Sequence, residues 1–260
     1  MNDDLASAAK QELQNFYNSE AEARSVDDWI TEGQRARVPE SVAAHYFVGH
    51  KVDTALTMAA AHSDGKALEV GSSLGQMTFL LSEKFASVSA VDLSPGCVQL
   101  AQRRADHYKV SNVSFRQADA ENLSLFDNDS FDVAFSFSAL RYVPDPNKAI
   151  REIHRTLKPG GIAVFDFPNK YCPWFGPVKK LFGIRKHIHD RLFSAREVAD
   201  MMAAAGYAEI KTRHLLFTTR RLPDSLLPLF KIIDAVLERI PLINRLAAII
   251  MVKGRKIESR

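Results

Sequence analysis

The sequence has little cysteine, no long apolar run and no block of like charge. Cys97 and Cys172 are its only cysteines, too few for a disulfide framework and without the spacing of a metal site. No apolar stretch approaches the roughly 20 residues that span a bilayer. The N-terminus carries Asp3 and Asp4 and lacks the basic and apolar regions of a secretory signal. We therefore expect no metal, no transmembrane segment and a cytoplasmic location.

The composition is that of an ordinary globular protein. The chain has 34 Lys and Arg against 31 Asp and Glu, a net charge of +3, and 46% hydrophobic residues. Because the basic residues form no single long block, nucleic-acid binding is not indicated. A length of 260 residues suits one large α/β domain, or one domain with a lid.

A glycine-punctuated turn at residues 69–75 is the most informative pattern. An apolar run at 67–70 leads into it, and a helix-like stretch follows. Glycine permits a tight turn, and the amide groups that open the next helix can face a polar or anionic ligand. A second apolar run ends at Asp92, 21 residues after Gly71. An acid at about that distance in a βαβ unit typically binds ribose hydroxyls.

The glycine spacing separates the possible nucleoside cofactors. A dinucleotide fingerprint needs glycine at its first, third and sixth positions, but counting from Gly71 the chain has Ser73 and Gln76. The turn resembles instead motif I of the class I S-adenosylmethionine-dependent methyltransferases, an acid followed by Gly-x-Gly-x-Gly. Glu69, Gly71 and Gly75 match it, and Ser73 replaces the middle glycine. If that position needs a positive φ, serine there costs on the order of 1 kcal/mol.

The resemblance extends over most of the chain. Residues 115–125 are similar to the family segment in which an acid meets the adenine amino group. Residues 130–140 resemble the fourth strand and the loop beside the methyl donor, and 157–161 match the turn before the fifth strand. The pattern is most similar to the small-molecule subgroup that includes quinone- and sterol-methylating enzymes. Where that subgroup often has histidines, this chain has Arg141 and Tyr142.

The resemblance implies an α/β fold: a Rossmann-like, mostly parallel sheet of seven strands in the order 3-2-1-4-5-7-6, with helices on both faces. A helical lid is expected at 1–60 and the main domain at 61–260, with a substrate-side insertion at 168–192. The implied activity moves a methyl group from S-adenosylmethionine to an oxygen, nitrogen or carbon of a small acceptor, such as a lipid-like molecule or a natural-product intermediate. The alternatives are a catalytically silent nucleotide-binding or scaffold protein and an NAD(P)-dependent oxidoreductase.

The resemblance also implies site residues. The cofactor contacts would be Glu69, Gly71, Ser72, Ser73, Gly75, Asp92, Leu93, Asp119, Ala120, Ser136 and Phe137. Candidate substrate contacts are Tyr17, Tyr46, Arg141, Tyr142, Tyr171 and Trp174. No catalytic residue is identified, although His45, Tyr142, His187 and His189 are candidate bases, because methyl transfer often needs little more than alignment. Glu69 could instead serve a salt bridge, and Phe137 could be a core residue.

Local signals place several elements. Ser94-Pro95 and Asp145-Pro146 each predict a helix start, and Ser194 with Glu197 forms a capping box. Strands expected at 208–217 and 247–253 would pair antiparallel at one sheet edge. The amphipathic stretch 226–246 predicts either a core-packing helix or a surface for peripheral membrane contact.

Overall fold

The computed structural model describes seven segments of the chain. His187 and His189 lie outside them, as does most of the expected insertion, and the side chain of Trp174 is not described. The described residues are 3–26, 30–32, 35–37, 42–60, 64–175, 191–219 and 222–257.

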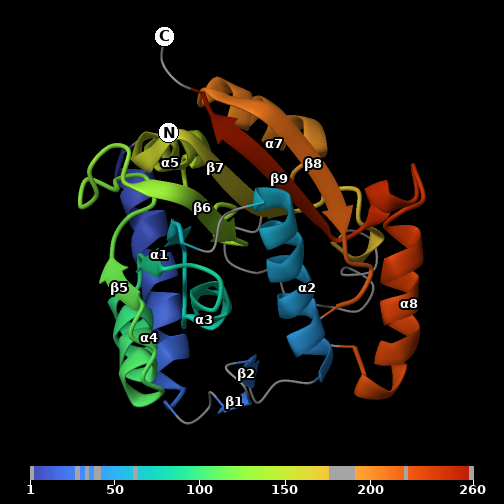
Figure 1. Cartoon of the computed structure of the whole chain (residues 1–260), viewed down its shortest axis with the longest axis horizontal. Helices are drawn as coiled ribbons and strands as arrows, with labels where there is room; N and C mark the ends of the chain where they lie inside the picture. The colour runs from blue at the N-terminus through green and yellow to red at the C-terminus, as the bar shows by residue number, and fades with distance from the viewer. Residues whose placement is uncertain are drawn as a thin grey trace.

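A seven-stranded sheet forms the centre of the molecule (Figure 1). The strands run from one edge to the other in the order β5-β4-β3-β6-β7-β9-β8, which is 3-2-1-4-5-7-6 when they are counted along the chain. The first five are parallel, and β9 is antiparallel to both of its neighbours, so the expected topology is confirmed. The strands are β3 (Lys66–Val70), β4 (Ser87–Asp92), β5 (Val113–Gln117), β6 (Phe131–Phe137), β7 (Leu157–Pro168), β8 (Tyr207–Leu215) and β9 (Ile249–Lys256).

Helices cover both faces of the sheet because the central strands are apolar on both sides. On one face α5 (Pro146–Thr156) and α7 (Ala195–Ala204) pack against the strands. On the other face lie α2 (Val42–Ala59), α3 (Gln76–Ser82) and α4 (Pro95–His107). This arrangement leaves the carboxyl ends of the parallel strands as the edge where connecting loops meet.

The predicted helix starts are confirmed. Ser94 caps α4, because its hydroxyl accepts a hydrogen bond from the backbone N–H of Cys97 at 3.0 Å. Asp145 caps α5, and a proline follows each of these two residues. Both hydrogen bonds of the capping box of Ser194 and Glu197 are present at the start of α7. The turn expected at 157–161 lies within β7 instead, because Leu157 already pairs with β6 and a register shift separates it from the rest of the ladder.

The N-terminal 60 residues are not wholly helical, which corrects the expectation. Between α1 (Asp3–Glu22) and α2 a two-stranded antiparallel pair forms, β1 (Ile30–Glu32) with β2 (Arg35–Arg37). Ile30 and Thr31 are β-branched, and such side chains favour strands.

Residues 226–246 are helical only in their first half. A 3-10 turn η2 (Asp224–Leu226) leads into α8 (Leu227–Leu237), and a further turn η3 (Asn244–Leu246) follows Pro241, which cannot donate a helical hydrogen bond. Another 3-10 turn, η1 (Pro173–Phe175), follows β7. Among the described helices none is long and apolar enough to cross a membrane.

Candidate functional site

The loop from Gly71 to Gly75 connects β3 to α3 in a strained conformation. Both glycines have φ of +84°, and a Cβ added to Gly71 would lie 2.1 Å from the Cβ of Ala139. Glycine is therefore required for the loop to approach the segment after β6. Ser73 has φ of +48°, so this position does need the left-handed region, and the expected strain of about 1 kcal/mol applies.

Asp92 ties this loop to the following helix. One carboxylate oxygen accepts the N–H of Ser73 at 2.7 Å and the other accepts the N–H of Ser94 at 2.9 Å. Burial raises the pKa of Asp92, and these backbone hydrogen bonds oppose the rise. Each oxygen retains a lone pair for a further donor, so Asp92 can hold two hydroxyls at the end of β4.

Glu69 is almost fully buried, with 1% of its surface exposed. The Thr78 hydroxyl donates to its carboxyl group at 2.5 Å. Burial raises the pKa of Glu69 to about 8, and the charge of Asp92 adds to the rise while Thr78 and Lys51 oppose it. At neutral pH the group is therefore mostly protonated, and it would ionise beside a bound cation.

A buried ion pair joins α2 to the carboxyl ends of β6 and β7. The Lys51 ammonium lies 2.5 Å from the Asp166 carboxylate and donates to the Ser138 hydroxyl at 2.8 Å. The backbone N–H of Ser138, at φ of +57°, also donates to Asp166. Both charged side chains are at most 1% exposed, so each is stable only in the presence of the other.

Three of the predicted substrate contacts converge near this ion pair. Tyr17 on α1 and Tyr142 after β6 have ring centroids 6.3 Å apart, and the Arg141 guanidinium lies 5.1 Å from the Tyr142 ring. Burial raises the pKa of Tyr17, with the neighbouring Tyr142 and Asp92 adding to the rise. Burial lowers the pKa of Arg141, and Tyr142 and Asp166 oppose the fall. The predicted Tyr17, Arg141 and Tyr142 are thus brought together by α1 and the loop after β6.

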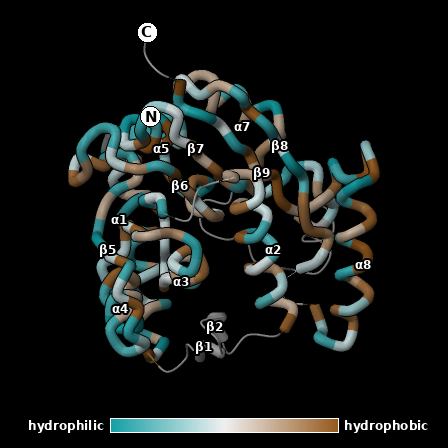
Figure 2. Tube along the Cα trace, viewed as in Figure 1, coloured by the Kyte–Doolittle hydropathy of each residue, from teal (hydrophilic) through white to brown (hydrophobic). Residues whose placement is uncertain are grey.

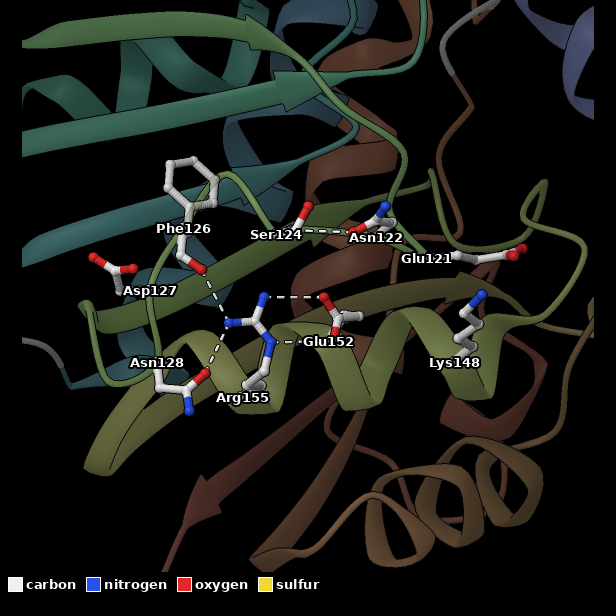
Figure 3. A pocket seen from close by; sticks show the side chains of 9 residues that line it. All are labelled: Glu121, Asn122, Ser124, Phe126, Asp127, Asn128, Lys148, Glu152 and Arg155. Atoms are coloured by element: carbon white, nitrogen blue, oxygen red, sulfur yellow. Dashed lines mark hydrogen bonds and ion pairs between the residues drawn. The ribbon is translucent and has the colours of Figure 1, made fainter.

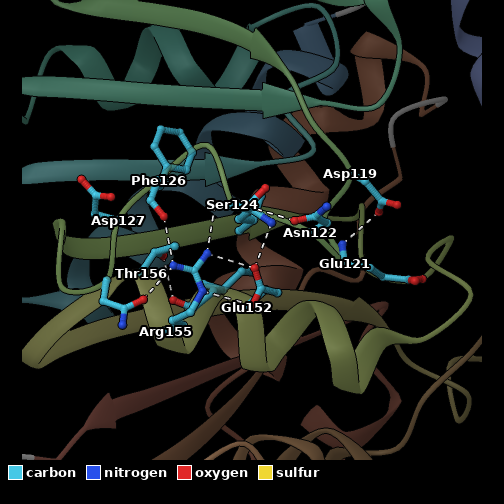
Figure 4. A network of polar contacts seen from close by, with 12 residues as sticks. Asp119, Glu121, Asn122, Ser124, Phe126, Asp127, Glu152, Arg155 and Thr156 are labelled. Carbon is cyan, nitrogen blue, oxygen red and sulfur yellow. Dashed lines mark hydrogen bonds and ion pairs between the residues drawn. The ribbon is translucent and has the colours of Figure 1, made fainter.

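Helix α1 also lies across the predicted adenine contact. The Lys10 ammonium is 2.6 Å from Asp119 and 2.8 Å from Glu121. Asp119 also accepts the backbone N–H of Glu121, as Figure 4 shows. About two turns further along α1, Asn18 accepts a hydrogen bond from the Ser94 hydroxyl at 2.7 Å. A cofactor at this edge would therefore contact α1 as well as the sheet.

A hollow of about 840 Å³ lies against α5 and the 121–128 loop (Figure 3). Its Arg155 donates to the carbonyls of Phe126 and Leu123, each at 2.9 Å, and pairs with Glu152 at 3.0 Å. These bonds fasten the loop to α5 and use the guanidinium fully, as the network in Figure 4 shows. We assign this hollow a structural role, because it contains neither the glycine loop nor Asp92.

The remaining predicted cofactor residues have mostly backbone or core contacts. Ser136 donates its hydroxyl to the Val70 carbonyl at 2.8 Å, and Phe137 stacks on Phe135 with ring centroids 5.9 Å apart, as a core residue would. The Leu93 carbonyl accepts from Gln14 of α1 at 3.3 Å. Ala120 is partly buried against the core.

Two predicted substrate contacts lie elsewhere. Tyr46 on α2 packs against α8, with the Lys231 ammonium 5.2 Å from the centroid of its ring. Tyr171 is 57% exposed beside Lys170. His45 is a partly buried residue of α2. The 1–60 segment therefore contributes to the site through α1 and Lys51.

The sequence reasoning missed Lys51, Ser138 and Asp166. Asp166 had a visible signal, because it lies within the last apolar run of β7 in the same way that Asp92 ends β4. Lys51 had none, since one lysine in an amphipathic helix is usually solvated.

Comparisons with known proteins agree with this geometry. Residues 68–165 match the family model of a methyltransferase domain. A malonyl-[acyl-carrier protein] O-methyltransferase of Paenibacillus sp. is 29% identical over 57% of this chain and 57% of its own length. A ubiquinone biosynthesis O-methyltransferase of Pseudomonas syringae pv. tomato is 34% identical over 40% of this chain and 45% of its own length. The chain spans about half the length of these curated relatives.

Solved structures share the fold. The [4+2]-cyclase SpnF superposes with a TM-score of 0.69 and 21% identity, covering 96% of this chain and 97% of that one. A Thermotoga maritima protein described as a SAM-dependent methyltransferase superposes with a TM-score of 0.58 and 21% identity, over 83% of this chain and 91% of that one. The family match covers residues 68–165, and the strand order and the glycine loop agree with a methyltransferase domain in this part of the chain.

Proposed function

We propose that this protein transfers a methyl group from S-adenosylmethionine to an oxygen, nitrogen or carbon atom of a small-molecule acceptor. One observation carries the proposal: Glu69 and Asp92 flank the same left-handed loop at the carboxyl ends of β3 and β4. This is the edge at which open α/β sheets bind ligands. The curated relatives are named as a malonyl-[acyl-carrier protein] O-methyltransferase and a ubiquinone biosynthesis O-methyltransferase, and these names support a small acceptor.

The residues present suit this cofactor. The Ser72 hydroxyl is buried in the glycine loop and, among the described residues, has no hydrogen-bond partner, so a ligand group could satisfy it. Asp92 would accept from the ribose hydroxyls, and Glu69 would ionise beside the methionine ammonium group. Asp119 would accept from the adenine amino group on the lone pairs that Lys10 leaves free.

When bound, S-adenosylmethionine supplies a methyl group on a positively charged sulfur. The chain's own contribution is alignment and the exclusion of water. Lys51 and Asp166 hold α2 over the ends of β6 and β7, and Tyr17 brings α1 against Tyr142. Because burial raises the pKa of Tyr17, its hydroxyl stays protonated and serves as a hydrogen-bond donor to the acceptor rather than as a base.

The same contacts support a division of the chain into two parts. We propose that residues 1–60 form the lid and residues 61–260 the methyltransferase domain, with 168–192 on the acceptor side. The contacts of Lys10, Tyr17 and Lys51 support this, since all three belong to the first 60 residues and meet the carboxyl ends of strands that follow.

The experiment is calorimetric titration with S-adenosylmethionine, S-adenosylhomocysteine and NAD. We expect binding of the two sulfur nucleosides and none of NAD. Asp92→Ala should weaken binding at least about tenfold, since a pair of hydrogen bonds to a charged group is lost. Asp127 is an exposed acid of the 121–128 loop, so Asp127→Ala is the matched control and should bind as the wild type does.

Turnover is then measured as S-adenosylhomocysteine formed in the presence of quinol, fatty-acyl and phenolic acceptors. Cofactor binding without product from any acceptor would favour the catalytically silent alternative, for which the strained Ser73 is the structural argument. Binding of NAD in place of the sulfur nucleosides would refute the proposal.

A further inference from the structure

The outer face of α8 exposes an unusual amount of apolar surface. Leu229, Ile232 and Val236, at helical spacing on one side, are 55%, 62% and 49% exposed. Of the 13 large hydrophobic side chains exposed in the described chain, eight fall within residues 226–246. The others in this group are Leu226, Ile240, Leu242, Ile243 and Leu246. Figure 2 shows the corresponding hydrophobic segments along α8, on the opposite side of the molecule from α1 and α4.

The inner face of α8 is where the acids lie. Asp234 is fully buried and accepts the N–H of Phe217 at 2.6 Å and the hydroxyl of Thr218. Glu238 is 9% exposed and accepts the N–H of Leu216 at 2.9 Å. These bonds hold the segment after β8 against α8. The helix is thus amphipathic in the reverse sense, since its carboxylates face the protein and much of its apolar surface faces outward.

The charges that remain outside are all positive. Asp234 and Glu238 are the only acids in residues 226–246, and both are turned inward, whereas Lys231, Arg239 and Arg245 are exposed. Arg239 follows Val236 by three residues and therefore borders the apolar stripe. Within residues 226–246, the apolar face therefore has a cationic border, which is complementary to a surface that is apolar inside and anionic at its rim.

We propose that this outer face of α8, with the turn through η3, docks on the surface of an anionic lipid bilayer. Leu229, Ile232 and Val236 enter the boundary between headgroups and acyl chains, and Arg239 and Arg245 contact lipid phosphates. The inference goes beyond methyl transfer and requires neither cofactor nor acceptor.

A second copy of the chain fits this face less well than lipid does. In a two-fold symmetric dimer the same patch meets itself. The exposed cations of one copy would then face those of the other, with no acid in residues 226–246 available to neutralise them.

Vesicle sedimentation of the cofactor-free protein tests the inference. We expect co-sedimentation with vesicles of phosphatidylcholine and phosphatidylglycerol, and at least about tenfold weaker partitioning to phosphatidylcholine alone. The double variant Leu229→Ser/Ile232→Ser should lose at least about tenfold in partitioning, because two inserted side chains are removed. Arg239→Gln/Arg245→Gln should abolish most of the preference for the anionic lipid.

Leu5→Ser is the matched control, since Leu5 is 65% exposed and belongs to α1, which lies on the opposite side of the molecule from α8 in Figure 1. It should leave vesicle binding unchanged, and circular dichroism and the melting temperature establish that each variant is folded. Three results would overturn the inference: no vesicle binding by the folded wild type, an equal loss in Leu5→Ser, or a wild-type dimer in light scattering that the Leu229/Ile232 variant dissociates. The α8 variants are also titrated with S-adenosylhomocysteine, which separates this test from that of the proposed function. If the methyltransferase assignment failed, vesicle binding would remain.

Discussion

Cofactor binding should release a proton from Glu69. Its carboxyl group is buried, accepts a hydrogen bond from the Thr78 hydroxyl of α3, and has a pKa raised by burial to about 8. At pH 7 about nine tenths of the molecules therefore carry a neutral Glu69. A methionine ammonium group beside it favours the ionised form, so binding at pH 7 should release close to one proton from this group.

The same linkage sets the pH dependence of affinity. Since binding requires the ionised form, the association constant should rise about tenfold from pH 6 to 7 and about fivefold from pH 7 to 8, and level off above that. The folded pKa lies above the unfolded value of 4.5, so Glu69 makes the ligand-free protein less stable as pH rises from about 4.5 to about 8. Cofactor should offset that loss, and the protection it provides against thermal unfolding should grow over the same range.

The assay is calorimetry with S-adenosylhomocysteine at pH 7 in two buffers of different ionisation enthalpy. Glu69→Gln is the control, because it keeps the size and can still bond to Thr78 but cannot ionise. We expect weaker binding in the variant and a smaller proton release. If wild type and variant released the same number of protons and showed the same pH profile, the assignment of Glu69 to the ammonium group would be refuted.

Three further outcomes follow from the geometry. Lys51→Met should lower the free energy of unfolding in urea by about 3–5 kcal/mol because it leaves the buried Asp166 unpaired, and Lys51→Met/Asp166→Leu should recover part of that loss; equal losses would argue against a coupled pair. Ser73→Gly should raise the free energy of unfolding by up to about 1 kcal/mol by relieving the left-handed strain, and no gain would mean that serine is unstrained there. Gly71→Ala should lower the melting temperature more than Gly160→Ala does, since both have positive φ but only the first would place its Cβ within 2.1 Å of another atom; similar losses would contradict the packing argument.

Local patterns in the sequence were sufficient to predict many of the strands and helix starts, and the part of the site formed by the glycine loop and Asp92. Hydrophobic runs and glycines predicted the β3 loop and the position of Asp92, because a strand, a tight turn and a helix start are set by residues close in the chain. The three caps at Ser94, Asp145 and Ser194 are local for the same reason. The strand order came from the family resemblance, and the ladders confirm it.

Contacts between distant segments were decided only by the tertiary structure. The ion pair of Lys51 with Asp166 joins residues 115 positions apart, and the contact of Lys10 with Asp119 spans 109. Nothing local marks such partners, since a lone lysine or aspartate has the same appearance in sequence whether it is solvated or buried. The sequence also did not determine which face of α8 meets the protein, because apolar residues occur on both faces of the helix. The burial of Asp234 and Glu238 against the segment after β8 shows which face is turned inward. Periodicity predicts that a helix has two faces, but the side that meets the protein depends on which polar partners the rest of the fold supplies.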